Sequence, residues 1–328
     1  MPLAENDSRW LAATAALAAR ARPLSRPNPA VGAIIVRDGC VVGRGWTGTG
    51  GRPHAEAAAL ESAGEAARGA ALYVTLEPCA HQSPRGPSCA DLVAASGLAR
   101  VIVGCEDPDP RTAGQGIARI AAAGIAVELR PCAASRESLV GYLALRRLGR
   151  PLVTLKLALS LDGCIAMADG QSQWITGAPA RAHGHAMRAR SDAILVGGGT
   201  LRADHPRLDV RLPGLEARSP ERWVLTGGVV PDGWRKLAAP EDISGIGDMQ
   251  YLLVEGGAQA AAAFLAAGLV DRLLIYRAPI IIGDGKPGLA NIGLAALADA
   301  HGQWRMIDRR MLGSDTLEVY ERSPCSQE

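Results

Sequence analysis

The sequence lacks long hydrophobic runs. No stretch of its 328 residues approaches the ~20 apolar residues without a charge that a membrane-spanning helix needs. The opening segment, MPLAENDSRWLAATAAL, has acidic residues where a secretory signal would have positive ones. We therefore expect a soluble protein with no membrane partner.

The sequence also lacks an excess of charge of one sign. The formal net charge is +2, and the lysines and arginines are scattered along the chain. Proteins that bind nucleic acid usually gather these residues into a basic stripe or patch. We expect a small-molecule partner, which can still be an anion, and no nucleic-acid partner.

Cysteine is too scarce for a disulfide framework. Seven cysteines, an odd number, are spread over the whole chain. Disulfide frameworks are typical of short secreted chains with many cysteines. The pattern indicates a reducing compartment, so we expect a cytoplasmic protein in which a few thiols carry chemistry.

The chain has the composition and length of a globular protein with two domains. Hydrophobic residues make up 48% and charged residues 21% of the 328 residues, and domains commonly span about 100 to 200 residues. Strand and helix patterns alternate through both halves, which predicts an α/β fold. The run LVGYLALRRLGRP reads as a helix that leads into a linker. We place the domains at residues 1–147 and 148–328.

Individual elements follow from the hydrophobic periodicity and the turn residues. The first half begins with a helix over 9–20 and a hairpin formed by 31–36 and 40–45. The second half begins with a strand in PLVTLKLAL and ends with antiparallel strands in MIDRRM and TLEVYER. No repeat relates the two halves.

His54, Cys79 and Cys89 are candidate zinc ligands. Catalytic zinc commonly takes three protein ligands of imidazole and thiolate type and keeps one position open for water. Each of the three residues stands where a strand or loop meets a predicted helix. Glu56 lies two positions after His54, so on a regular helix it points away from that ligand and can act as a base beside the metal.

The order of these residues corresponds to the nucleobase deaminase pattern, H-x-E followed by P-C-x-x-C, in which the glutamate moves protons and does not bind zinc. The spacing differs, because Cys89 follows Cys79 by ten positions instead of three. HAE is common by chance, and a single buried cysteine is usually packing. The segments HAE and TLEPC in this order favour the zinc site over those alternatives.

The second half contains two glycine clusters after strands. Gly197–Gly199 does not make a G-x-G-x-x-G fingerprint, and Asp204, Arg188 and Arg211 lie near it in the sequence. The segment VEGGAQAAAAFL places two glycines at a helix N-terminus, which can bind phosphate. A nucleotide site and a purely structural turn remain equally good interpretations of these residues.

With these motifs in order, the chain resembles the bifunctional deaminase/reductase family of riboflavin biosynthesis over about residues 9–320. The segments that carry the resemblance are RPNPAVGAIIV, HAE, TLEPCAH, PSCADL, EDPDPRTAGQG, KLALSLDG, QSQWIT, DAILVGGGTLRADHPRLDVR and VEGG. The resemblance implies an N-terminal cytidine-deaminase-like α/β/α domain and a C-terminal dihydrofolate-reductase-like α/β domain. It also implies that zinc serves the first domain and NADPH the second.

The resemblance assigns site residues position by position. It makes His54, Cys79 and Cys89 the zinc ligands and Glu56 the catalytic proton shuttle. It implies that Asn28, Asp107, Ser172, Arg188, Leu208, Arg211 and Glu255 bind substrate. It implies that Ala158, Trp174, Thr200, Asp204, Gly227 and the segment from Gly257 bind NADPH, with Lys156 as a further polar group.

The resemblance implies two successive reactions on one pyrimidine ribosylamine phosphate. The first is hydrolytic deamination of 2,5-diamino-6-ribosylamino-4(3H)-pyrimidinone 5′-phosphate. The second is reduction of the ribosyl group to ribityl by NADPH, which gives 5-amino-6-ribitylaminouracil 5′-phosphate. We also expect a homo-oligomer, although no motif specifies its interface.

Several positions depart from the family pattern. Thr47 stands where many relatives have histidine, and Asp109 where many have asparagine. The zinc loop is one residue longer than the commonest form. The segment 228–250 is shorter than expected, which affects the assignment of Gly227.

Two other functions remain open at this point. One is a nucleoside or tRNA deaminase with an inactive reductase-like domain, although a tRNA substrate predicts a basic surface. The other is a regulator with structural zinc, although such sites usually have four protein ligands and only three are found here.

Overall fold

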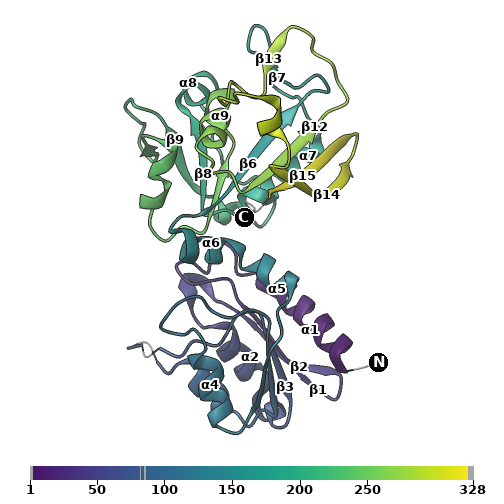
Figure 1. The fold of residues 1–328 in the computed structure, drawn as a ribbon, viewed down its shortest axis with the longest axis vertical. Coiled ribbons are helices and arrows are strands. Elements are labelled where there is room, and N and C mark those ends of the chain that lie inside the picture. The colour runs from purple at the N-terminus through teal and green to yellow at the C-terminus, as the bar shows by residue number, and fades with distance from the viewer. Residues whose placement is uncertain (1–2, 82, 85, 324–328) are drawn as a thin grey trace. The chain divides into compact units, whose positions relative to one another are not determined.

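The computed structural model describes residues 3–81, 83–84 and 86–323. The chain divides into two compact units, Met1–Gly149 and Arg150–Glu328. Each unit has its own β-sheet and its own hydrophobic core (Figure 1). No helix in the described ranges has both the length and the apolar character needed to cross a membrane.

The first unit is built on a five-stranded sheet in the order β2-β1-β3-β4-β5. Its strands are β1 (Gly32–Arg37), β2 (Cys40–Trp46), β3 (Ala71–Val74), β4 (Arg100–Val103) and β5 (Ala126–Leu129). Its helices are α1 (Leu3–Ala18), α2 (Ala55–Ala63), α3 (Cys89–Ala94), α4 (Gln115–Ala122), α5 (Ala133–Ser138) and α6 (Val140–Leu148). The expected hairpin is present as β1 and β2, and β3, β4 and β5 run parallel.

Helices cover both faces of this sheet because side chains along a strand alternate between the faces. Ile35 of β1 belongs to the core that contains residues of α2, α3, α4 and α6. Its neighbour Ile34 belongs to the opposite core, together with Leu11 of α1. Helices α1 and α5 lie side by side on that second face (Figure 1). The sequence-based prediction of an α/β/α domain is confirmed.

Two glycines of β2 let α2 pack directly against the sheet. A Cβ atom at Gly43 would lie 2.4 Å from the carbonyl oxygen of Ala59, and one at Gly45 would lie 2.3 Å from that of Ala55. Real Cβ atoms do not approach so closely, so only glycine fits at both positions. This contact fixes the start of α2, where His54 and Glu56 lie.

The second unit is built on an eight-stranded sheet in the order β10-β9-β8-β11-β6-β12-β15-β14, beside a two-stranded sheet of β7 and β13. Its strands are β6 (Leu152–Leu159), β7 (Cys164–Met167), β8 (Ala193–Gly197), β9 (Glu221–Leu225), β10 (Arg235–Leu237), β11 (Tyr251–Val254), β12 (Arg272–Arg277), β13 (Gly285–Pro287), β14 (Trp304–Leu312) and β15 (Asp315–Arg322). Its helices are α7 (Ala178–Arg188), α8 (Gly198–Asp204) and α9 (Ala258–Ala266). The predicted closing pair of antiparallel strands is confirmed by β14 and β15.

Helices again cover both faces of the large sheet. Phe264 of α9 packs in the core that contains Leu155 of β6 and Leu195 of β8. On the other face, Met187 of α7 packs against Ile194 of β8. Strands β6, β8 and β11 are parallel neighbours, so their carboxyl ends lie at one edge of the sheet. Ligands of α/β sheets commonly bind at such an edge.

Candidate functional sites

Three side chains in the first unit form a group that can hold a metal ion. The ligand atoms of His54, Cys79 and Cys89 all lie within 4.8 Å of one another. Nδ1 of His54 is 3.2 Å from Sγ of Cys89 and 3.5 Å from Sγ of Cys79. One imidazole and two thiols make a donor set that fits zinc and leaves a fourth position for water.

Secondary structure brings the three residues together. His54 is the N-cap residue of α2, and Cys89 is the first residue of α3. Cys79 follows β3, and the backbone N–H of Cys89 donates to its sulfur at 3.3 Å. Ser88 caps α3 by accepting a hydrogen bond from the backbone N–H of Asp91. The three positions are therefore fixed by helix starts that pack on one sheet.

The electrostatics of the group suit metal binding. The thiol of Cys89 and the ring of His54 hydrogen-bond to Cys79 and lower its pKa, which favours the thiolate that zinc requires. Glu56 is only 4% exposed. Its burial raises its pKa to about 7 despite the opposing charge of His54. A carboxyl group of this kind can both accept and donate a proton near neutral pH.

A pocket of about 180 Å³ adjoins this group. His54, Glu56, Cys79, Asn28 and Asp107 line it. The amide nitrogen of Asn28 lies 3.1 Å from Nε2 of His54 and donates to the carbonyl of Gly51. The structure thus brings the expected substrate residues of the first domain beside the candidate metal ligands.

Two of the departures from the family pattern, Thr47 and Asp109, also line this pocket. Thr47 is buried, accepts a hydrogen bond from the backbone N–H of Val31 and donates to the carbonyl of Pro29. It therefore ties the segment after Asn28 to the end of β2. Asp109 is buried as well and pairs with arginines, as described below.

Glu77 is a structural residue of the site that sequence reasoning missed. Its buried carboxylate accepts backbone hydrogen bonds from Gly114, Gly116 and Ile117 at 2.9–3.2 Å. These bonds hold the segment that carries Asp107 and the start of α4. Its place in TLEPC, directly before the metal loop, was the available signal.

The second unit contains a larger cavity of about 1240 Å³ at the carboxyl ends of its parallel strands. It brings together the residues of the second half that the resemblance singled out, except Gly227. The lining includes Lys156, Ala158, Ser172, Trp174, Arg188, Thr200, Asp204, Leu208, Arg211, Glu255 and Gly257. Gly227 follows β9, and its carbonyl accepts a hydrogen bond from Lys236 at 2.9 Å instead.

A buried carboxylate organises the polar wall of this cavity. The oxygens of Glu255 lie 2.8 and 3.0 Å from two nitrogens of Arg188, and one of them lies 3.6 Å from Nζ of Lys156. Burial alone would raise the pKa of Glu255, but the charges of Lys156 and Arg188 outweigh it and lower the pKa to about 2. The carboxylate therefore stays ionised.

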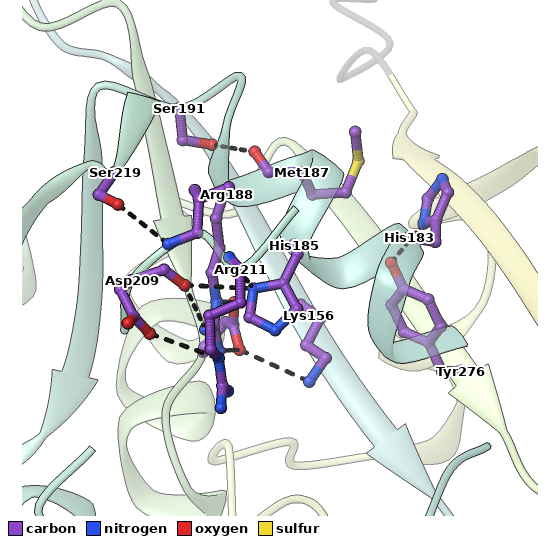
Figure 2. A network of polar contacts seen from close by, with 12 residues as sticks. Lys156, His183, His185, Met187, Arg188, Ser191, Asp209, Arg211, Ser219 and Tyr276 are labelled. Carbon is purple, nitrogen blue, oxygen red and sulfur yellow. Dashed lines mark hydrogen bonds and ion pairs between the residues drawn. The ribbon is translucent and has the colours of Figure 1, made fainter. Parts of the chain in front are cut away.

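Further polar groups gather around Asp209, as Figure 2 shows. The backbone carbonyl of Asp209 accepts a hydrogen bond from Arg188 at 3.1 Å and lies 3.2 Å from Nδ1 of His185. The same His185 nitrogen lies 3.3 Å from the backbone nitrogen of Arg211. His185 lines the cavity and was missed by sequence reasoning, because no motif marks it. Burial and the charges of Arg188 and Arg211 lower its pKa.

Tyr276 is a second residue of the cavity that the sequence did not reveal. Its ring lies 5.8 Å from Nζ of Lys156, and its hydroxyl group is 2.7 Å from Nδ1 of His183 (Figure 2). It lies on β12, whose apolar pattern predicted only a core strand.

Leu208 has a left-handed backbone with φ of 54°, a conformation that is strained for leucine.

Comparison with known families assigns both halves of the chain. The model of the cytidine and deoxycytidylate deaminase zinc-binding region matches residues 4–105. The model of the RibD C-terminal domain matches residues 151–231 and 245–316. The first match contains His54, Glu56, Cys79 and Cys89.

Individual relatives are similar over nearly the whole chain. The riboflavin biosynthesis protein RibD of Escherichia coli K12 is 39% identical, and the match covers 94% of this chain and 97% of the relative. A structure of Acinetobacter baumannii RibD has 32% identity and a TM-score of 0.86, covering 98% of this chain and 99% of that one. A Thermotoga maritima structure described as a diaminohydroxyphosphoribosylaminopyrimidine deaminase/5-amino-6-(5-phosphoribosylamino)uracil reductase has 29% identity and a TM-score of 0.86, covering 97% and 99%.

Proposed function

The chain belongs to the RibD family of riboflavin biosynthesis proteins, bifunctional enzymes with a deaminase and a reductase domain, and we propose that it acts twice on one pyrimidine nucleotide. The first unit deaminates 2,5-diamino-6-ribosylamino-4(3H)-pyrimidinone 5′-phosphate by hydrolysis. The second unit reduces the ribosyl group of the product to ribityl with NADPH. We place the boundary between the two activities at the linker near residue 148.

In the deamination, His54, Cys79 and Cys89 hold one zinc ion per chain. Zinc, when bound, supplies the Lewis acidity that makes water nucleophilic near neutral pH. Glu56 takes a proton from the water that attacks the ring carbon bearing the 2-amino group. It passes this proton to the ring nitrogen, then takes the proton of the added hydroxyl group and passes it to the departing amine, so that ammonia leaves as the carbonyl forms. Asn28 and Asp107 line the same pocket and orient the ring.

In the reduction, NADPH, when bound, would supply the hydride, and C1′ of the ribose in its opened imine form would accept it while the imine nitrogen takes a proton from solvent. Ser172, Arg188, Leu208, Arg211 and Glu255 bind the substrate in the large cavity, and Ala158, Trp174, Thr200, Asp204 and Gly257 bind the cofactor. The glycines of VEGG bring the first turn of α9 close to the end of β8, where a Cβ at Gly256 would lie 3.5 Å from the backbone nitrogen of Gly197. A Cβ at Gly256 would lie 2.6 Å from the Cβ of Ala260.

The observation that carries the proposal is the convergence of His54, Cys79 and Cys89 with a buried glutamate, in a chain whose second unit has a large cavity and matches the RibD C-terminal domain. Both family matches count against a nucleoside or tRNA deaminase with an accessory domain. Free thiols at the metal site support a cytoplasmic location. The homo-oligomer stays a prediction that analytical ultracentrifugation can test.

One incubation tests both reactions. The purified protein is given the diaminopyrimidine phosphate with and without NADPH. We expect ammonia release in both samples and oxidation of NADPH in the sample that contains it. Ammonia release without NADPH oxidation would leave the second half of the proposal unsupported, and no ammonia release from zinc-loaded protein would contradict the first half.

A further inference from the structure

Two arginines share one buried carboxylate at the wall of the deaminase pocket. Arg111 lies in the segment between β4 and α4, and Arg146 lies on α6. Oδ2 of Asp109 is 2.6 Å from one terminal nitrogen of Arg111 and 3.2 Å from one of Arg146. Nε and the backbone N–H of Arg111 donate to Oδ1 at 2.9 and 3.1 Å. Asp109 therefore holds both guanidinium groups at fixed positions.

Asp109 is one carboxylate facing two guanidinium groups, and the carboxylate of Asp107 lies beside it, accepting a hydrogen bond from the backbone N–H of Asp109 at 3.0 Å. The side chain of Asp109 is 6% exposed, whereas those of Arg111 and Arg146 are 59% and 42% exposed. The two side-chain hydrogen bonds that Arg111 donates to Asp109 leave its other terminal nitrogen without a hydrogen-bond partner among the described residues. Exposed N–H groups on a guanidinium that is held in place are usual features of an anion site.

Packing holds Arg146 from a second side. Its guanidinium lies 5.4 Å from the ring centre of Tyr142, one helical turn earlier on α6. The hydroxyl group of Tyr142 donates to Asp107 at 2.8 Å, so the same tyrosine also fixes a wall of the pocket. Because the side chain of Arg146 is held on two sides, less of its conformational entropy is lost when a ligand binds.

The pocket is too small to enclose a whole nucleotide. Sites that enclose a drug-sized ligand usually measure about 300–1,000 Å³, whereas this pocket measures about 180 Å³. It has room for a pyrimidine ring beside the candidate zinc ligands, but the ribose phosphate must extend toward solvent. Among the described residues, three arginines line the pocket, Arg52, Arg111 and Arg146, and only the last two are exposed.

We propose that Arg111 and Arg146, oriented by Asp109, bind the 5′-phosphate of the substrate at the deaminase site. The inference rests on the proposed function, because the substrate must be a nucleotide. It gives the first unit a phosphate-binding site of its own, separate from that of the reductase cavity. The deaminase then selects phosphorylated over unphosphorylated substrate.

The test compares deamination of the diaminopyrimidine ribosylamine 5′-phosphate with that of its dephosphorylated form. Arg111→Gln and Arg146→Gln should each raise KM for the phosphate by about 10-fold, the loss typical of a charged hydrogen bond, with little change in kcat. KM for the dephosphorylated compound should stay the same. Arg147→Gln is the matched control, because Arg147 is the exposed neighbour on α6 and does not line the pocket.

Each other outcome overturns a different claim. Equal losses on both compounds, or an unchanged KM for the phosphate, would assign Arg111 and Arg146 a structural role only. A wild-type enzyme that prefers neither compound would also contradict the inference while leaving the proposed deamination intact. If zinc-loaded wild type deaminates neither, the proposed function fails and the phosphate site fails with it. Zinc content and Tm of each variant, measured in parallel, separate a binding defect from misfolding.

Discussion

Arg188 and Glu255 form a two-point ion pair, with Nε 2.8 Å from Oε1 and a terminal nitrogen 3.0 Å from Oε2. The remaining terminal nitrogen of Arg188 donates to the carbonyl of Asp209. All three guanidinium nitrogens of Arg188 therefore have a partner. The side chain of Arg211 is 54% exposed, and its ion pair with Oδ1 of Asp209 is longer, at 3.5 Å. Arg211 is the better candidate for holding the substrate phosphate in the reductase cavity.

Replacing one partner of this buried pair should lower the free energy of unfolding more than replacing both partners with apolar residues. Arg188→Met leaves the carboxylate of Glu255 buried with Lys156 alone, and we expect the free energy of unfolding to fall by about 3 kcal/mol. The double variant Arg188→Met/Glu255→Leu should recover part of that loss, as urea denaturation would show. Arg235→Gln, which breaks an exposed ion pair with Glu221, should cost less than ~1 kcal/mol. A double variant no more stable than Arg188→Met would argue against an uncompensated buried charge.

Arg211→Gln should weaken substrate binding in the reduction. We expect KM for the deaminated nucleotide to rise by about 10-fold, the loss of one charged hydrogen bond, while the Kd of NADPH and the rate of ammonia release stay near wild type. Steady-state kinetics with the supplied intermediate, and fluorescence titration of NADPH, measure these effects. Arg235→Gln is again the control, since Arg235 lies outside the cavity. An unchanged KM would leave phosphate binding to other residues.

Glu56→Gln should separate the two activities. The amide keeps the shape of the side chain but cannot accept the proton of water, so deamination should fall by at least ~10²-fold. Zinc content should remain near wild type, because Glu56 is not one of the three candidate ligands. Reduction of the supplied intermediate should be nearly normal. Loss of both reactions in a folded, zinc-loaded variant would require a shared or coupled site.

Cys89→Ser should remove most of the bound zinc. A serine hydroxyl is a much weaker zinc ligand than a thiolate, so metal content and deamination should fall together. Elemental analysis of the purified protein measures the first and ammonia release the second. Cys164→Ser is the control, because Cys164 is also buried but lies in the second unit. If Cys89→Ser kept full zinc and activity, His81, whose Nδ1 is buried without a hydrogen bond among the described residues, would be the next candidate.

Asp7 should make the first unit less stable in acid. Burial alone would raise the pKa of Asp7, but hydrogen bonds from Arg100 and Tyr73 outweigh it and the pKa is lowered. A lowered pKa gives stability that is fully present above the unfolded value of about 3.9 and is lost as pH falls through the folded value.

The variant Asp7→Asn tests this pH dependence. We expect it to lose about 2 kcal/mol of unfolding free energy at pH 7, where charged hydrogen bonds are lost, and less at pH 3, which is below the unfolded pKa. Urea denaturation at both values measures the difference. Asp38→Asn, at a side chain that is 93% exposed, should change little at either pH. A loss at pH 3 as large as that at pH 7 would mean that the charge of Asp7 is not responsible.

The first candidate site could be found in the sequence because its parts are local. His54 and Glu56 lie two positions apart at a helix start, and Cys79 follows a strand whose pattern is clear. Short motifs of this kind keep their geometry wherever the fold places them. The order of the motifs then predicted that they meet, and the structure brings their ligand atoms together.

Features that depend on distant packing could not be predicted. Helix α8 begins at Gly198, in a glycine run for which a nucleotide site and a structural turn were equally good interpretations and no helix was expected, because glycine disfavours helices. The cluster of Asp109 and Arg146 joins residues 37 positions apart, and no periodicity relates them. The pairing of β7 with β13 likewise joins segments far apart in the sequence, so single-strand patterns do not reveal it.

The contact between β2 and α2 sets the mutational tolerance of this part of the enzyme. Gly43 and Gly45 face the helix that carries Glu56, and each is buried, whereas Arg44 between them is exposed. A side chain at either glycine must move the helix, so even alanine there should impair deamination although it touches neither metal nor substrate. Tolerance to substitution along β2 should therefore alternate with a period of two. Substitutions can abolish activity at residues that contact neither the metal nor the substrate.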